Sequence, residues 1–76
     1  MNISEAMKIK RRIQDSCGID SKMIDLPIVG FVLSVERNSI DVSSYKLLAD
    51  FAVENNLSLQ LEIGAFIISD RVLPPR

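Results

Sequence analysis

The sequence predicts a small α+β domain in which two helices pack on one face of a single sheet of three or four mostly antiparallel strands. Three observations lead to this fold class. The 76 residues suffice for one domain, covering residues 1–76. Residues 57–72 alternate apolar and polar side chains around a glycine, which is typical of a β-hairpin. Residues 3–17 and 44–55 carry apolar side chains at helical spacing. The expected order is helix, strand, an optional further strand, helix, strand, strand.

The first helix is expected over residues 3–17, with Asn2 as its N-cap and Gly18 just beyond its end. Its apolar residues fall on one side at a spacing of three or four. Cys17 lies on that side and is interpreted as a small core residue. Lys10 lies at the edge of the same side, so its aliphatic stem is expected along the core.

Residues 18–27 are rich in turn-forming residues, and we expect them to be a connector that lies against the fold. Residues 28–36 are expected to form a central strand because both of its faces are apolar or small. Gly30 in this strand leaves space for a close approach to the main chain. We favour a packed helix over a ligand as the group that approaches it.

Two alternatives remain open for residues 39–42. They form a short antiparallel strand after a tight turn at residues 37–38, or they are a loop that leads into the second helix. In the second case the helix is a crossover, and strand 28–36 runs parallel to residues 57–63.

The second helix is expected over residues 44–55, with Ser43 as its N-cap. Its apolar residues cover more than half of the helix circumference, and its only continuous polar wedge is Lys46, Asp50 and Glu54. A helix on the surface of a sheet needs a narrower apolar side than this. The second helix therefore requires cover from the sheet and also from the first helix or a partner subunit.

The last hairpin is expected to turn at Gly64 and Ala65 in a type II′ turn. The facing pairs in that register are Ile63 with Phe66, Leu61 with Ile68, and Leu59 with Asp70. Two consecutive prolines make residues 73–76 an extended tail. The predicted core consists of Ile9, Ile13, Val29, Phe31, Leu33, Val35, Leu48, Phe51, Ala52, Leu59, Leu61, Ile63, Phe66 and Ile68.

The composition argues against catalysis and metal binding. The chain has no histidine and one cysteine, so it lacks the residues of common nucleophilic triads and of zinc sites. Its three glycines are too far apart for a phosphate-binding loop, and no calcium-loop spacing occurs. We therefore expect a protein that is not an enzyme and that has no catalytic residues, cofactor or metal. An enzyme using surface carboxylates is the least favoured alternative.

Localisation follows from the same composition. No export signal is visible, and the longest apolar run, residues 28–35, is too short to cross a bilayer. A single cysteine is typical of a reducing compartment. We expect a cytoplasmic protein with no membrane partner.

Self-association is the favoured function class. Apolar residues make up 47% of this short chain, which has no intrachain disulfide to stabilise it, so burial against a second copy is expected. Ile67 is expected to be exposed on the outer face of an edge strand, with Val32 nearby. Ile67, Val32 and Tyr45 are the candidate self-association residues of a non-catalytic protein–protein interaction module that forms a homodimer.

The alternative is a weak, sequence-nonspecific nucleic-acid binder. The candidate phosphate contacts are Lys8, Lys10, Arg11 and Arg12 on the first helix. The net charge of −1 and the lack of interleaved aromatic residues count against this function. A solvated helix face with Glu5–Lys8 and Arg11–Asp15 ion pairs is the competing interpretation of the same residues.

Overall fold

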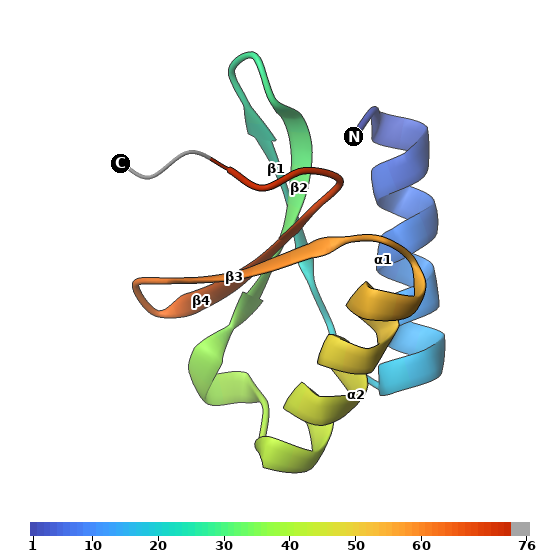
Figure 1. Ribbon diagram of the computed structural model, residues 1–76, viewed down its shortest axis with the longest axis vertical. Helices are drawn as coiled ribbons and strands as arrows, with labels where there is room; N and C mark the ends of the chain where they lie inside the picture. The colour runs from blue at the N-terminus through green and yellow to red at the C-terminus, as the bar shows by residue number, and fades with distance from the viewer. Residues whose placement is uncertain (74–76) are drawn as a thin grey trace.

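The computed structural model describes residues 1–73 and has the predicted fold class. Within these residues the chain forms two α-helices, a short 3-10 turn and a four-stranded antiparallel sheet (Figure 1). The elements in chain order are α1 (Ile3–Cys17), β1 (Lys22–Leu26), β2 (Gly30–Glu36), η1 (Arg37–Ser39), α2 (Val42–Glu54), β3 (Ser58–Glu62) and β4 (Ala65–Ser69). The strands lie side by side in the order β1-β2-β4-β3. Residues 74–76 of the predicted tail lie outside the described residues.

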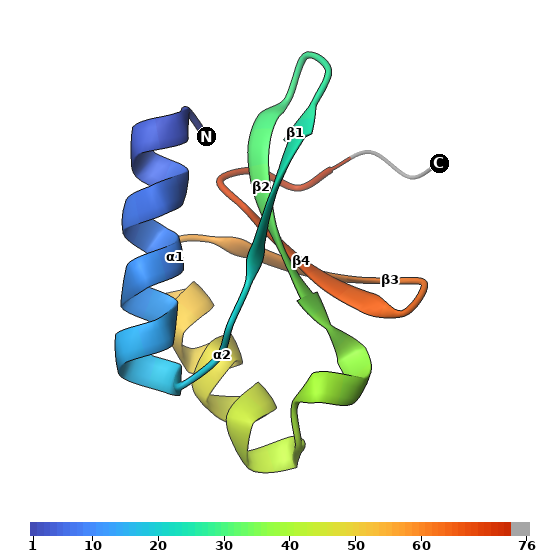
Figure 2. The same cartoon turned by 180° about the vertical axis from the view of Figure 1, so that it is seen from behind.

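Both helices cover the same face of the sheet, here called the inner face. α1 contacts β1 and β2, and α2 lies beside α1 and contacts β3. Figures 1 and 2 show the same arrangement from opposite sides, with β3 and α2 nearer the viewer in the first and β1 and α1 nearer in the second. The centre of the core consists of fully buried side chains from all the layers: Ile13, Leu33, Val35, Leu48 and Ile68.

The predicted bounds of the first helix are confirmed. The side chain of Asn2 accepts a hydrogen bond from the amide N of Glu5 at 2.8 Å, which caps the helix amino end. Gly18 follows the helix with a φ of 66°, a left-handed conformation that glycine adopts without strain. Cys17 is buried in the core, as expected.

The prediction that residues 18–27 are only a connector is wrong, because Lys22–Leu26 form strand β1. β1 pairs antiparallel with β2, and Ile24 lies opposite Val32. β2 correspondingly begins at Gly30 rather than at residue 28. The sequence of β1 alone does not predict a strand, and its pairing with β2 in a four-stranded sheet stabilises it.

The group that approaches Gly30 is the main chain of Met1, neither a packed helix nor a ligand. A Cβ atom on Gly30 would lie 2.8 Å from the carbonyl O of Met1. Met1 and Phe31 exchange two main-chain hydrogen bonds, of 2.8 and 3.0 Å. The ammonium of Met1 also lies 3.4 Å from the Oδ1 atom of Asp70. Met1 therefore extends the sheet ladder beside β2, beyond the point where β4 ends.

Of the two alternatives for residues 39–42, the strand is wrong. Residues 37–39 form η1, and α2 begins at Val42 with Asp41 as its N-cap, not Ser43. The crossover follows as expected: β2 and β3 run in the same direction, because both are antiparallel to β4, which lies between them.

The predicted hairpin register is shifted by two residues. Glu62 pairs with Ala65, so the two-residue turn is Ile63 and Gly64. Gly64 is then the second residue of the turn, with a φ of 76°, as in a type II turn. The actual facing pairs are Leu61 with Phe66 and Leu59 with Ile68. A shift of two residues leaves every side chain on its predicted face.

This shift changes the edge of the predicted core. Leu61 and Ile63 are exposed, because the turn carries them beyond the helices. Two groups of predicted core residues remain. The buried members are Ile13, Leu33, Val35, Leu48, Phe51, Ala52 and Ile68, and the half-buried ones packed against the core are Ile9, Phe31, Leu59 and Phe66. The prediction is wrong for Val29, which lies in the turn between β1 and β2 and does not pack against the core.

Candidate interaction surface

An exposed apolar stripe runs along α2 on the side that faces away from α1. It consists of the exposed Val42, Tyr45 and Val53 and the half-buried Ala49, whose spacing of three, four and four places them on one side of the helix. Val42, Tyr45 and Val53 are 85%, 40% and 78% exposed. Phe51 lies nearly opposite the stripe and faces α1, where the guanidinium of Arg12 lies 5.3 Å from its ring centre.

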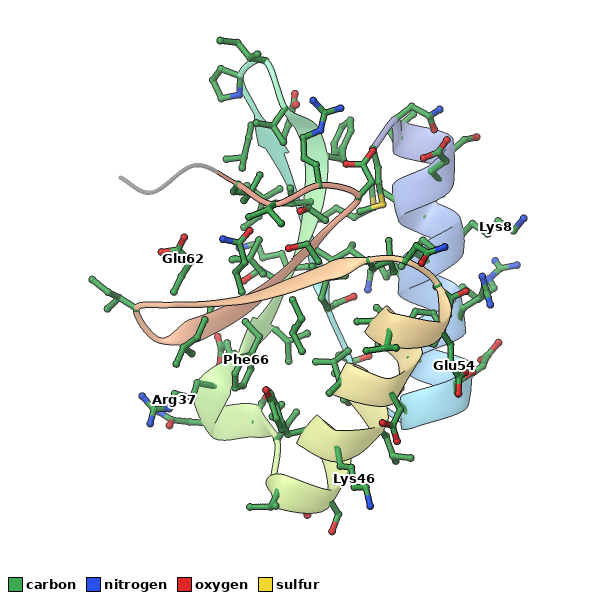
Figure 3. All side chains as sticks on the ribbon, viewed as in Figure 1. Lys8, Arg37, Lys46, Glu54, Glu62 and Phe66 are labelled. Carbon is green, nitrogen blue, oxygen red and sulfur yellow. The ribbon has the colours of Figure 1, made fainter. Side chains whose placement is uncertain are left out.

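The apolar surface continues from the start of α2 onto the hairpin. The rings of Tyr45 and Phe66 lie 5.0 Å apart between centres at an angle of 40°. Ile40, Val42, Tyr45 and Phe66 line a shallow hollow of about 220 Å³, and the charged residues Arg37 and Asp41 line it as well. Phe66 lies between the hairpin and η1 (Figure 3), and its partner on β3 is Leu61, which is 61% exposed. The α2 stripe together with Leu61 is called the α2–β3 surface below.

β3 borders this surface with an open strand edge. Within residues 1–73 it pairs with β4 on one side and with no strand on the other. The residues that flank a two-residue turn form a hydrogen-bonded pair, here Glu62 and Ala65. Because hydrogen-bonding direction alternates along an antiparallel strand, the N–H and C=O groups of Leu59 and Leu61 point away from β4. The open edge therefore offers main-chain donors and acceptors beside an apolar surface.

The three candidate self-association residues do not lie on one surface. Val32 and Ile67 are on the outer face of the sheet, whereas Tyr45 is on α2 over the inner face. Val32 is only 1% exposed, and Ile67 is half-buried on β4, an inner strand of the sheet. The expectation that Ile67 is exposed on an edge strand is therefore wrong.

The chain after β4 explains this difference, because it turns back across the sheet (Figure 1). The side-chain amide of Gln60, which lies on the outer face beside Ile67, holds this segment at Leu73. Its oxygen accepts from the Leu73 N–H at 2.7 Å, and its nitrogen donates to the Leu73 C=O at 3.3 Å. A side-chain to main-chain pairing across 13 residues has no local sequence signal.

The four candidate phosphate contacts divide between two sides of α1. Lys8 and Arg12 border an open groove of about 300 Å³ that Asn55 and Asn56 close on the other side. Glu5 and Asp70 also line this groove, so its charge is mixed. Lys10, half-buried as expected, shares a second hollow with Arg11, one of about 270 Å³.

The ion pairs of the competing interpretation, a solvated helix face, are not formed among residues 1–73. Within residues 1–73, none of the four cationic groups lies within 4.0 Å of a carboxylate oxygen, so Glu5–Lys8 and Arg11–Asp15 are not ion pairs. Lys8 projects away from α1 into solvent (Figure 3). Lys8, Lys10 and Arg11 are therefore available to a negatively charged partner, whereas the guanidinium of Arg12 lies over the ring of Phe51.

The titratable groups with shifted pKa values have structural explanations. Burial raises the pKa of the Cys17 thiol, which disfavours the nucleophilic thiolate. The hydrogen bond from the amide of Ser44 lowers the pKa of Asp41. The described part of the chain contains no group of three residues suited to hold a metal ion. No helix within residues 1–73 has the length and apolar character needed to cross a membrane.

No family model, curated protein or solved structure matches the chain. The fold and its surface define the class of protein: a small α+β domain with an apolar stripe on α2 beside an open strand edge.

Proposed function

We propose that the protein is a small non-catalytic interaction module that self-associates through the α2–β3 surface. The observation that carries this proposal is the exposure of Val42 and Val53 on one side of α2 and of Leu61 on β3, the strand that α2 contacts. Single exposed apolar residues are ordinary, but a group of them beside the Tyr45–Phe66 pair is typical of an interaction site. The half-buried Ile67 on the outer face supports association less well.

The free energy gained by burying these apolar side chains can be compared with the cost of association. Burial of an exposed valine or leucine side chain contributes about 1.5 kcal/mol or more. Two copies would bury six such side chains, which gives on the order of 10 kcal/mol. The loss of translational and rotational freedom on association costs about 4–15 kcal/mol. Because this cost is of the same size as the apolar gain, we expect further contacts in the dimer interface.

The oligomeric state tests the proposal, with a matched pair of variants. Val53→Asp places a charge in the α2 stripe, whereas Val72→Asp places the same charge on the segment after β4. The two valines are 78% and 77% exposed, so the variants differ in location rather than in burial. Light scattering after size-exclusion chromatography should show a dimer for the wild type and for Val72→Asp, and a monomer for Val53→Asp. A monomeric wild type at high micromolar concentration would contradict the proposal.

One observation favours a second function, binding of nucleic-acid phosphates by α1. Lys8, Lys10, Arg11 and Arg12 have no carboxylate partner within residues 1–73. Their division between two sides of the helix and the acidic groups beside Lys8 make this the weaker candidate. Its signature would be binding to RNA or DNA that weakens steeply with salt.

A further inference from the structure

We propose that two copies of the chain associate by pairing their β3 edges antiparallel, with a two-fold axis at Gln60. The two four-stranded sheets then become one continuous sheet. This inference rests on the proposed self-association and specifies its geometry. It joins three separate features of the described residues: the open edge of β3, the sequence of β3 and the apolar stripe of α2.

The main chain of β3 is suited to this pairing. The outward N–H and C=O groups belong to Leu59 and Leu61. A two-fold axis at Gln60 places Leu59 of each copy opposite Leu61 of the other, which gives two such pairs. Each of these pairs exchanges two hydrogen bonds, so four unpaired donors and four unpaired acceptors find partners. The open edge is thereby satisfied along its whole length.

The side chains of β3 are self-complementary in the same register. The strand reads Ser-Leu-Gln-Leu-Glu, which is nearly symmetric about Gln60. On the inner face, the exposed Leu61 lies beside Leu59 of the second copy. On the outer face, Glu62 lies opposite Ser58, so the only ionised group of the strand meets a neutral hydroxyl and no like charges face each other.

The opposite edge of the sheet lacks this symmetry. A two-fold axis at Ile24 in β1 would place Asp25 opposite Met23 and Lys22 opposite Leu26. Both arrangements put a charge against an apolar side chain. Charged residues on an edge strand protect it from pairing with another chain. The structure therefore has one protected edge, β1, and one edge suited to a second copy, β3.

The helices support the same arrangement. α2 contacts β3, and Phe51, nearly opposite the apolar stripe, faces α1, so the stripe lies on the side of α2 away from α1. β3 lies at the sheet edge opposite β1, the edge strand that α1 contacts (Figure 1). In the joined sheet, the α2 helices of the two copies lie over the same inner face with their stripes toward each other. Val42, Tyr45 and Val53 would then be covered by the matching residues of the second copy. One two-fold axis thus covers the open strand edge and the exposed helix stripe together.

Register-specific disulfide formation tests this geometry. In the proposed register, position 60 of each copy forms a non-hydrogen-bonded pair, in which Cα atoms lie about 4.5 Å apart, within disulfide range. Oxidised glutathione serves as the oxidant, and Cys17 is buried and stays unchanged. Gln60→Cys should form a covalent dimer on a non-reducing gel. Ser58→Cys should not, because the two copies of position 58 lie roughly 13 Å apart.

Gln60→Cys removes the Gln60 amide and could impair folding. A mixture of two other variants tests the same register while keeping Gln60. Position 58 of one copy pairs with position 62 of the other, so Ser58→Cys mixed with Glu62→Cys should form the covalent heterodimer. A wild-type dimer in light scattering combined with self-crosslinking of Ser58→Cys would overturn the β3 pairing and leave the proposed self-association standing. A dimer that forms neither the position 60 disulfide nor the 58–62 disulfide would also overturn the β3 pairing and leave the proposed self-association standing. A monomeric wild type overturns both proposals. A strand of another protein would then be the partner to test at the β3 edge.

Discussion

At the scale of single residues, Ile28 has the least favourable backbone conformation. Its φ of 71° lies in the left-handed region, which a β-branched side chain disfavours. The amide of Val29 donates to the carbonyl of Pro27 at 2.7 Å, which closes a γ-turn around it. The side chain of Ile28 is fully exposed and packs against nothing that offsets this strain. The pairing of β1 with β2 on both sides of the turn holds the conformation.

The substitution Ile28→Asn should therefore stabilise the protein. Asparagine adopts positive φ more readily, and relief of the left-handed conformation contributes about 1 kcal/mol. Ile63→Asn is the control, since Ile63 is equally exposed in a turn but does not have a positive φ. Urea unfolding should give a higher free energy of unfolding for Ile28→Asn and a change within about 0.5 kcal/mol for Ile63→Asn. Equal effects of the two substitutions would contradict the strain at Ile28.

At the scale of elements, the start of α2 depends on one exposed carboxylate. The Oδ1 atom of Asp41 accepts a hydrogen bond from the amide N of Ser44 at 2.8 Å. This bond favours the ionised form and lowers the pKa of Asp41 from its ordinary value of 3.8. Because the folded pKa is below the unfolded one, the cap stabilises the fold fully above the unfolded pKa. The stabilisation is lost as the pH falls through the folded pKa.

Two substitutions of Asp41 separate the cap from its charge. Asp41→Asn keeps an oxygen acceptor, so it should retain most of the stability at neutral pH while losing the part of the acid sensitivity that comes from this carboxyl. Asp41→Ala should lower the free energy of unfolding at neutral pH, and the difference from the wild type should shrink toward about pH 3. Chemical unfolding at the two pH values measures both effects. An Asp41→Ala variant as stable as the wild type at neutral pH would show that the cap contributes nothing.

The elements also show what the sequence predicts and what it does not. α1 is predicted to the residue, because Asn2 and Gly18 mark its two ends. β1 is missed, because Met23 and Ile24 are adjacent apolar residues without clear alternation, and the strand forms only by pairing with β2. For the hairpin, the predicted face of each side chain is correct and the predicted cross-strand pairs are wrong. Alternation of apolar and polar residues determines which face a side chain lies on, but it does not determine the register of the two strands.

The candidate surface is predicted in part for similar reasons. The wide apolar side of the second helix indicates that the sheet alone cannot cover it. The exposed stripe is the part of this apolar side that neither α1 nor the sheet covers. The position of Tyr45 on this apolar side is therefore predicted from the sequence, and its role in self-association stays a prediction. The exposure of Leu61 depends on a register that the sequence does not fix, and the cover over Ile67 depends on Gln60 holding Leu73.

At the scale of the whole molecule, the apolar and basic surfaces lie on different sides. α1 carries the four cations and packs against the side of α2 that bears Phe51, whereas the α2 stripe lies nearly opposite Phe51 on that helix. The net charge of −1 gives no general attraction for polyanions, so any binding of nucleic acid must come from α1 locally. The two functions can therefore be tested independently.

Salt dependence is the test for the basic surface. Fluorescence anisotropy of a labelled single-stranded RNA at several salt concentrations gives the slope of log K against log salt, about 0.7 per phosphate contact. If α1 binds phosphates, Lys8→Gln with Arg12→Gln should lower the magnitude of this slope by about 1.4. Arg37→Gln with Lys46→Gln removes the same charge from η1 and α2, away from Lys8 (Figure 3), and should leave the slope unchanged. Equal effects of the two pairs, or no binding at low salt, would exclude a phosphate-binding role for α1.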